Sequence, residues 1–322
     1  MKRLISSIVA SVVLFTLLPL NAAAAQLLIP VGRVIGLQLH NDAIMVVAYD
    51  DVLGHQARSA GLKIGDEIVT IDGAAVDSAE DVRCALGRCG DTVELSVRRG
   101  SKINKISMKP ARTQDGPRLG VYLRQGIAGI GTVTFYDPET GAFGTLGHGV
   151  SDAKGKLLDM TRGNAYEAVI QTVKKGKSGD PGQLKGSADS DSAFGTLLRN
   201  TPQGVFGITK QGWKGEALPV AAYEEVTPGT ACIRSQITGD SVREYSVEIL
   251  KIYPKDRPDG RNFLIRVTDP ALLAETGGIV QGMSGSPICQ NGKIVGAVTH
   301  VLVNDPTMGY GIFIENMLEA AE

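Results

Sequence analysis

The chain has 322 residues, which is more than one small domain requires and suits two domains. Its hydrophobic fraction of 43% and charged fraction of 21% are typical of a globular protein and exclude a disordered one. The formal net charge of −1 leaves no electrostatic footprint for nucleic acid, so nucleic-acid binding is set aside. Forty glycines predict a β-rich structure with many tight turns.

The first 25 residues have the pattern of an export signal. Lys2 and Arg3 precede an apolar run over residues 4–20, and small alanines follow over 22–25. This is the order of a charged region, a hydrophobic region and a small-residue cleavage zone. We expect the chain to be exported, with residues 1–25 acting as a cleaved signal peptide or an uncleaved membrane anchor.

Residues 27–110 are predicted to form a first folded unit of short strands with one or two helices. Ser78 is the expected cap of a helix that continues to about Leu86, with Asp81 as its acidic partner. The segments 60–68 (AGLKIGDEI) and 71–73 (IDG) resemble a bacterial PDZ domain.

The PDZ resemblance implies a groove between a strand and a helix, which captures a peptide by strand addition. In this family the loop before the first strand binds a terminal carboxylate through backbone N–H groups, and Ile35, Gly36 and Leu37 occupy the matching position. The ligand could be external or a segment of the same chain. A groove that only docks against the neighbouring domain is the alternative.

Residues 118–320 are rich in predicted short strands, with a polar linker over 113–117 before them. Regular strands with glycine turns and little helix predict a pair of β-barrels or a sandwich. The expected fold is therefore mainly β: an N-terminal PDZ domain followed by a double barrel. The strand candidates are residues 119–123, 130–136, 143–147, 205–208, 245–250, 263–267 and 294–298.

The strongest chemical signal is the string 282–287 (GMSGSP), centred on Ser284. A nucleophilic serine needs a tight loop that exposes its Oγ, together with backbone N–H groups aimed at the developing oxyanion. The N–H groups of Gly282 and Ser284 are the expected oxyanion hole. The string resembles the nucleophile loop of trypsin-like serine peptidases.

A nucleophilic serine also needs a base, and the chain has four histidines. His40 and His55 fall in the PDZ segment, and His300 follows the serine loop. His148 follows an apolar strand of the first predicted barrel, which is the order of parts in trypsin-like enzymes. His148 is therefore the candidate base, whereas spacing does not choose among the nine aspartates between His148 and Ser284.

Six strings of the C-terminal half share one further resemblance: 129–132 (GIGT), 146–148 (LGH), 268–270 (TDP), 275–288 (ETGGIVQGMSGSPI), 296–301 (GAVTHV) and 303–307 (VNDPT). They closely resemble the stage IV sporulation protein B family, and the resemblance extends over the whole chain. It implies a triad of His148, Asp269 and Ser284 in a serine endopeptidase that also processes itself. It further implies secretion into the space between forespore and mother cell, and cleavage of a membrane-bound regulator that releases an intramembrane protease and activates a mother-cell sigma factor.

His300 lies 16 residues after Ser284, on a strand expected to line the primary specificity pocket. By analogy with other trypsin-like peptidases, we hypothesise that it reads a glutamate or glutamine side chain before the scissile bond. A buried structural histidine is the alternative.

Three other functions are weighed against the peptidase: a non-catalytic PDZ scaffold, a broad quality-control protease and a metal hydrolase. Quality-control proteases usually carry the PDZ domain after the catalytic one, whereas here it comes first. The histidines lack paired spacing, so neither a metal nor a cofactor is expected. Cys84, Cys89, Cys232 and Cys289 are expected to be free or partly paired structural cysteines, and the sequence leaves their pairing open.

Overall fold

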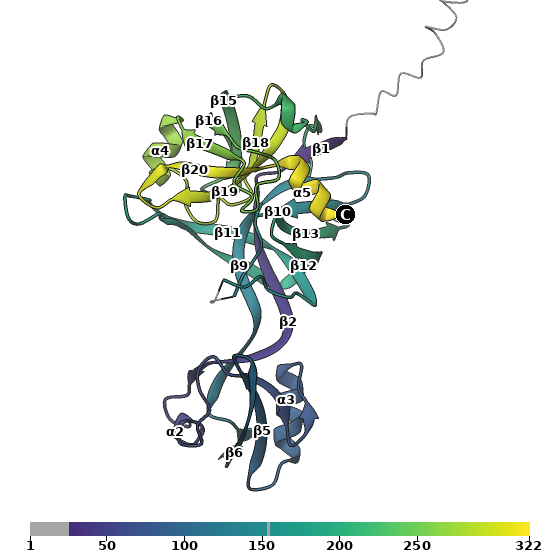
Figure 1. Ribbon diagram of the computed structural model, residues 1–322, viewed down its shortest axis with the longest axis vertical. Helices are drawn as coiled ribbons and strands as arrows, with labels where there is room; N and C mark the ends of the chain where they lie inside the picture. The colour runs from purple at the N-terminus through teal and green to yellow at the C-terminus, as the bar shows by residue number, and fades with distance from the viewer. Residues whose placement is uncertain (1–25, 153–154) are drawn as a thin grey trace, which may run out of the picture.

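The computed structural model describes residues 26–152 and 155–322, and its architecture is mainly β. The predicted export segment, residues 1–25, lies outside the described residues. Two barrels lie side by side, and a smaller α+β module extends from one of them (Figure 1). Within the described residues, no helix combines the length and the apolar character that crossing a membrane would need.

The first barrel is a ring of six strands in the order β9-β10-β13-β12-β11-β2, closed by the pairing of β2 with β9. Alternating side chains of these strands point into its core, as the period of two requires. Its strands are β2 (Val34–Tyr49), β9 (Val121–Tyr136), β10 (Ala142–Thr145), β11 (Arg162–Lys174), β12 (Gln183–Thr201) and β13 (Gly204–Thr209).

The second barrel closes in the order β15-β16-β17-β20-β19-β18. Tyr245, Val247 and Ile249 alternate inward along β16 and pack on Phe263 and Ile265 of β17 in one buried cluster. Its strands are β15 (Gly229–Gln236), β16 (Val242–Ile252), β17 (Phe263–Val267), β18 (Pro287–Gln290), β19 (Lys293–Leu302) and β20 (Asp305–Phe313).

The α+β module is built around its own core. In its helix α3, Val82 and Leu86 lie four residues apart on the buried face. Ser78 caps α3 by accepting a hydrogen bond from the Asp81 N–H, as the sequence predicted. The elements of the module are α2 (Gly54–Ser59), β3 (Glu67–Ile71), β4 (Ala74–Ala75), α3 (Ala79–Arg88), β5 (Val93–Arg99) and β6 (Lys102–Met108).

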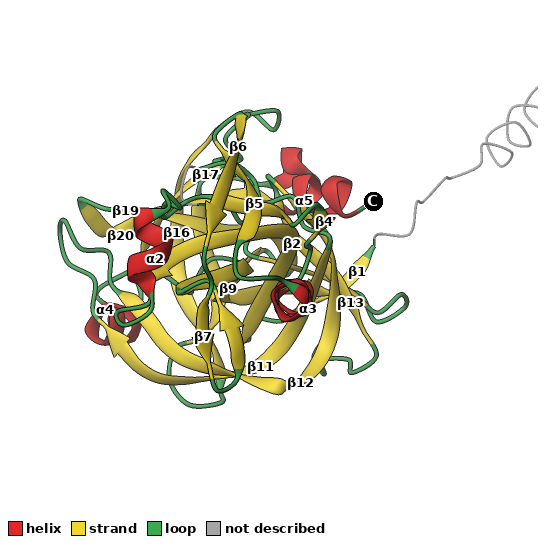
Figure 2. Cartoon of the chain, turned by 90° about the horizontal axis from the view of Figure 1, so that it is seen from below, coloured by secondary structure: helices red, strands yellow, loops and turns green. Residues whose placement is uncertain are grey.

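This module is inserted into the first barrel, not placed ahead of it. Up to Leu39, β2 pairs with β9 and β11 inside the barrel; from Ile44 onward it pairs with β9 and β3 outside it. The two strands therefore leave the barrel together as a ribbon that carries the module (Figures 1 and 2). The start of the predicted PDZ unit lies with the barrel instead. Residues 34–39 are part of its ring, and β1 (Leu27–Pro30) pairs with β9 beside the ring. An apolar strand pattern cannot reveal which sheet the strand joins.

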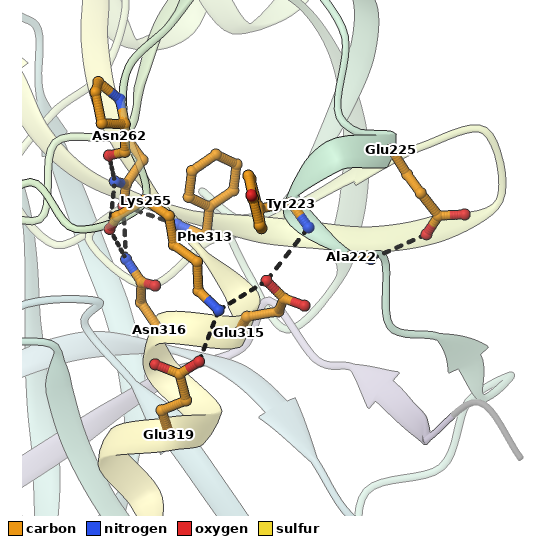
Figure 3. Close-up of polar contacts among 10 residues, drawn as sticks. Ala222, Tyr223, Glu225, Lys255, Asn262, Phe313, Glu315, Asn316 and Glu319 are labelled. Atoms are coloured by element: carbon orange, nitrogen blue, oxygen red, sulfur yellow. Dashed lines mark hydrogen bonds and ion pairs between the residues drawn. The ribbon is translucent and has the colours of Figure 1, made fainter. Parts of the chain in front are cut away.

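The C-terminal helix α5 (Ile314–Ala321) is held against the second barrel by a polar network (Figure 3). Lys255 lies between two carboxylates of this helix, 3.1 Å from Glu315 and 2.7 Å from Glu319. The side-chain amide of Asn316 donates to the Lys255 carbonyl oxygen at 2.9 Å and to Asn262 Oδ1 at 3.1 Å.

Short elements complete the chain and join the larger parts. They are β1 (Leu27–Pro30), β7 (Ala111–Thr113), β8 (Gly116–Arg118), β14 (Leu218–Pro219), the 3₁₀ turn η1 (Tyr223–Glu225) and α4 (Pro270–Thr276).

Candidate active site

The Ser284 loop joins α4 to β18 and depends on glycine at two positions. Gly282 has φ +101° and Gly285 has φ +96°, a region that other residues rarely adopt. A Cβ on Gly285 would lie 2.0 Å from the Thr132 carbonyl oxygen, so this glycine is also required by close approach. The loop therefore has the tight, glycine-flanked form predicted for a nucleophile loop.

Two buried threonines of β9 clamp this loop from the first barrel. Thr132 donates from its hydroxyl to the Gly282 carbonyl oxygen at 2.8 Å and from its N–H to the Ser284 carbonyl oxygen at 3.0 Å. Thr134 donates to the Gly285 carbonyl oxygen at 2.8 Å. The sequence analysis did not single out either threonine, because their partners lie about 150 residues away along the chain.

The backbone N–H groups of the loop divide into two sets. Those of Met283, Gly285 and Ser286 each donate to a carbonyl oxygen. Those of Gly282 and Ser284 make no backbone hydrogen bond within residues 26–152 and 155–322. These are the two groups that the sequence analysis assigned to the oxyanion hole, and they are unoccupied donors of the kind that such a hole needs.

His148 follows β10 through two residues with left-handed backbone, Leu146 at φ 70° and Gly147 at φ 68°. Positive φ in a leucine is strained, and such strain concentrates at functional sites. The His148 Nδ1 atom lies 2.9 Å from the Gly149 carbonyl oxygen. Since a carbonyl can only accept, Nδ1 carries the proton and Nε2 keeps the free lone pair of a base. Burial lowers the pKa of His148, although the hydrogen bond to Gly149 opposes this effect.

His148 and Ser284 line the same cavity, which has a volume of about 340 Å³ and lies between the two barrels. Around them the wall is largely apolar, as is common in ligand sites. The Ser284 hydroxyl donates to the Thr299 carbonyl oxygen at 2.8 Å. The other lining residues are Leu37, Leu39, Ile127, Gly129, Ile130, Leu146, Gly149, Val150, Ser151, Gln281 and Gly282.

His300 is brought next to the candidate base, with its ring centroid 5.2 Å from that of His148. Its Nδ1 atom is buried and has no hydrogen-bond partner within the part of the chain that the structure describes. Burial and the neighbouring His148 lower the pKa of His300 to about 4, so its ring is neutral near pH 7. It is not among the residues that line the cavity.

The hydrogen bonds of the Asp269 carboxylate go to backbone N–H groups, and none to His148 is found among the described residues. The Asp269 carboxylate is the N-cap of α4, where Oδ1 accepts from the N–H groups of Ala271 at 2.9 Å and Leu272 at 3.0 Å. Its Oδ2 accepts from the Ser246 N–H at 3.3 Å. These bonds join β16 to the helix that leads into the nucleophile loop.

Ile35, Gly36 and Leu37 do not form the peptide-binding loop that the sequence analysis assigned to them. They lie in the middle of β2 and pair with β11 on one side and β9 on the other. Ile35 is fully buried and Leu37 is 4% exposed. Because a strand already pairs with this segment on each side, no peptide can add beside it as a further strand. The prediction that residues 35–37 form the peptide-binding loop is therefore wrong.

The helix that would border a PDZ groove is covered by the chain itself. The hairpin β7–β8 follows the module, and its strand β8 packs against α3. Arg112 of the hairpin donates to the Gly90 carbonyl oxygen at 2.8 Å, just after α3 ends.

Family profiles match both parts of the chain. The profile described as SpoIVB peptidase S55 matches residues 115–318, and that of a PDZ domain matches residues 34–109. Both matches agree with the architecture predicted from the sequence.

Curated relatives match only short parts of the chain. It is 38% identical over 98 residues to a protein of Agrobacterium fabrum named as a zinc metalloprotease, and 44% identical over 54 residues to serine protease HTRA1 of Xenopus tropicalis. These stretches cover 30% and 17% of this chain, but 25% and 12% of the relatives. Across residues 26–152 and 155–322, no three His, Cys, Asp or Glu side chains gather as metal ligands would.

Among solved structures, the active form of the Rv3671c protease from M. tuberculosis is 15% identical, with a TM-score of 0.36, and covers 62% of this chain and 75% of its own. The PDZ domain of the SdrC-like protein from Listeria monocytogenes is 28% identical, with a TM-score of 0.23, and covers 26% of this chain and 88% of its own.

Proposed function

The chain belongs to the SpoIVB peptidase S55 family, and we propose that it is a serine endopeptidase with Ser284 as its nucleophile and His148 as its base. The observation that carries this assignment is the shared cavity between the barrels. Both side chains line it, and the two unengaged N–H groups belong to the loop that forms part of its wall.

The proposed reaction is acyl transfer. The Ser284 hydroxyl leaves the Thr299 carbonyl, gives its proton to His148 Nε2 and attacks the substrate carbonyl carbon. The N–H groups of Gly282 and Ser284 bind the oxyanion. The imidazolium protonates the leaving amine, and water then hydrolyses the acyl-enzyme. Catalytic hydrogen bonds often form only when substrate is bound, so the resting bond to Thr299 is compatible with this role.

We further propose that Asp269 supports the reaction through α4, instead of acting on the imidazole directly. The Gly149 carbonyl already holds Nδ1–H, the position that a triad carboxylate would take. Asp269 caps the helix that leads into the nucleophile loop, so its loss would disturb the placement of Ser284. In this proposal, only His148 and Ser284 of the triad implied by the family resemblance act directly on the reacting atoms.

A fluorophosphonate probe, which reacts only with an activated serine, tests the proposed pair. We expect the full chain to be labelled at Ser284, with labelling lost in Ser284→Ala and in His148→Ala. Ser151→Ala is the matched control, since Ser151 lines the same cavity and should leave labelling intact. Undiminished labelling of Ser284→Ala would contradict the assignment.

The proposed physiological substrate is a membrane-bound regulator of an intramembrane protease in sporulating cells, as the family resemblance implies. The proposed location is the space between forespore and mother-cell membranes, reached through the export segment. The wild-type and Ser284→Ala genes can be compared in an endospore-forming strain without its own family member. Restored mother-cell sigma-factor activity with wild type alone supports the role. Equal activity with both genes contradicts it.

Self-cleavage is proposed as a second activity of the same serine. Purified wild type should yield defined fragments, whereas Ser284→Ala should stay intact unless wild type is added.

A broad quality-control protease is the rival function. It would degrade unfolded casein extensively, whereas the proposed enzyme would leave most of it intact.

For the PDZ module we propose that the occupant of the α3 groove is the chain's own β7–β8 hairpin, which is supported by the packing of β8 on α3. Release of this hairpin would then open the groove to the substrate protein. Trypsin cleavage at Arg112 or Arg118 measures this release, because both residues lie in the hairpin. Substrate should accelerate cleavage there, and an unchanged rate argues against the proposal.

A further inference from the structure

Cys232 and Cys289 lie directly opposite each other on neighbouring strands of the second barrel. They are register partners in the antiparallel pairing of β15 with β18. Opposed residues in such a pair have Cα atoms about 4.5–5.5 Å apart, inside the range of about 4.4–6.8 Å that a disulfide bridges. No backbone movement is therefore needed to join them.

The two thiols are chemically unequal. Contact with the Cys289 thiol lowers the pKa of Cys232, and Cys232 is only partly buried. Contact with Cys232 and burial raise the pKa of Cys289, which is 6% exposed. Cys232 is therefore the thiol that ionises first and reaches an external reagent.

The strand pairing that carries them is the shortest in the second barrel. β15 and β18 are joined by two register pairs, Cys232–Cys289 and Ile233–Ile288. On its other side β15 pairs with β16 along the whole strand, from Gly229 to Gln236. A covalent link at this position would reinforce the shortest strand pairing of the closed barrel.

We propose that Cys232 and Cys289 form a disulfide in the folded protein when a small-molecule disulfide is present. The Cys232 thiolate attacks one sulfur of that reagent, which gives a mixed disulfide and releases one thiol. Cys289 then loses its proton to solvent and displaces the second thiol, closing the intramolecular bond. The two protein thiols are oxidised and the reagent disulfide is reduced to two thiols.

The bond would also steady the nucleophile loop. β18 begins at Pro287, three residues after Ser284. The buried Ser286 hydroxyl donates to the Ser235 hydroxyl of β15 at 3.1 Å, and each serine lies three residues along the chain from the cysteine of its own segment. A fixed β15–β18 junction therefore holds the C-terminal side of the loop, while Thr132 and Thr134 hold it from the first barrel.

The other two cysteines have no such geometry. Cys84 is exposed on α3, where its thiol donates to Glu80 at 3.5 Å, and Cys89 is the C-cap of the same helix. Five residues apart on a helix, their side chains point in different directions around its axis. They provide the matched control pair.

The test is to incubate reduced full-length protein with oxidised glutathione and to titrate free thiols after denaturation. In the double variant Cys84→Ala, Cys89→Ala, which removes the exposed Cys84 that glutathione would also modify, we expect both remaining thiols to disappear. Non-reducing peptide mapping of the wild type should recover one cross-linked pair that contains Cys232 and Cys289. Both thiols still titratable in the double variant, a stable glutathione adduct on Cys232, or a link to Cys84 or Cys89 would overturn the proposal. None of these readouts depends on peptidase activity.

Thermal unfolding supplies the second measurement. Closing a loop from Cys232 to Cys289 should raise the Tm of the oxidised wild type by about 5–15 °C over the reduced form. Cys232→Ala should show no rise, and the double variant Cys84→Ala, Cys89→Ala should keep it. An equal rise in Cys232→Ala would overturn the link as the cause.

Discussion

The two barrels hold the two proposed catalytic residues in different ways. In the first barrel, His148 follows a short strand through two consecutive left-handed residues and is held by the carbonyl of its own neighbour. In the second barrel, the Ser284 loop is held from outside, by Thr132 and Thr134 of the first barrel. The proposed base is thus positioned by its own neighbours in the chain, whereas the position of the proposed nucleophile depends on contacts between the barrels.

The barrels also differ in whether their strands extend beyond the closed ring. The second closes on itself within residues 229–313. The first extends through β2 and β9 into the inserted module, and Thr132 and Thr134 lie on β9, one of those two strands. The strand that contacts the Ser284 loop is therefore also one of the two strands that carry the PDZ module, so β9 links the module to this loop through the hydrogen bonds of Thr132 and Thr134.

The largest expected effect is the loss of either reacting group. Ser284→Ala or His148→Ala should lower kcat by about 10⁶-fold, and the double variant should be no slower than either single one, because the two act as a unit. Single-turnover kinetics on a peptide substrate measures this. Multiplicative losses in the double variant would show that the two barrels act independently.

The clamp between barrels should show the next largest effect. Thr132→Val removes the hydroxyl that donates to the partly buried Gly282 carbonyl oxygen, and a carbonyl left without its partner costs about 1–3 kcal/mol. Because the Gly282 N–H is a proposed oxyanion donor, kcat should fall about 10–100-fold at unchanged KM.

Thr209→Val is the matched control for the clamp. Its buried hydroxyl donates to the Phe194 carbonyl oxygen at 2.8 Å, away from the nucleophile loop. This variant should lose stability with little change in kcat. Equal kcat losses in both variants would mean that the threonine clamp has no special role.

Asp269 should respond to substitution as a helix cap. Asparagine caps as well as aspartate, so Asp269→Asn should keep kcat within about threefold, whereas Asp269→Ala should lose about 1 kcal/mol of stability. A triad aspartate would behave differently, since its replacement by asparagine lowers kcat by about 10⁴-fold. Measuring kcat and the unfolding free energy of both variants distinguishes a helix cap in the second barrel from a triad aspartate that acts on His148.

The smallest effect concerns pH. The pKa of His300 falls from 6.5 to about 4 on folding, so between these values the unfolded chain binds a proton that the folded chain does not. The unfolding free energy should therefore decrease as pH drops through this window. His300→Gln should make the unfolding free energy, measured in urea titrations, less dependent on pH, whereas exposed His55→Gln should not.

The His300→Gln variant also checks the specificity hypothesis when it is tested on Glu, Gln and Ala peptide series. Equal losses of cleavage rate on all three series would reject that hypothesis.

Much of the site could be predicted from local chemistry. The glycines around Ser284, the order of His148 before Ser284 and the cap at Ser78 are set by backbone and hydrogen-bond rules that act within a few residues. The roles of Thr132 and Asp269 could not be predicted, because each depends on which strand lies beside it. Sequence spacing does not encode that neighbour.

Sequence alone determined the mainly β class, the PDZ segment and the two residues expected to react, since short-range patterns specify turns, strands and loop chemistry. Only the tertiary structure decided that the PDZ module is inserted within the first barrel, that residues 35–37 lie inside a sheet, and that Cys232 faces Cys289. Strand pairing decides these features. It joins residues far apart in the chain, and an apolar strand can satisfy its hydrogen bonds with many possible partners.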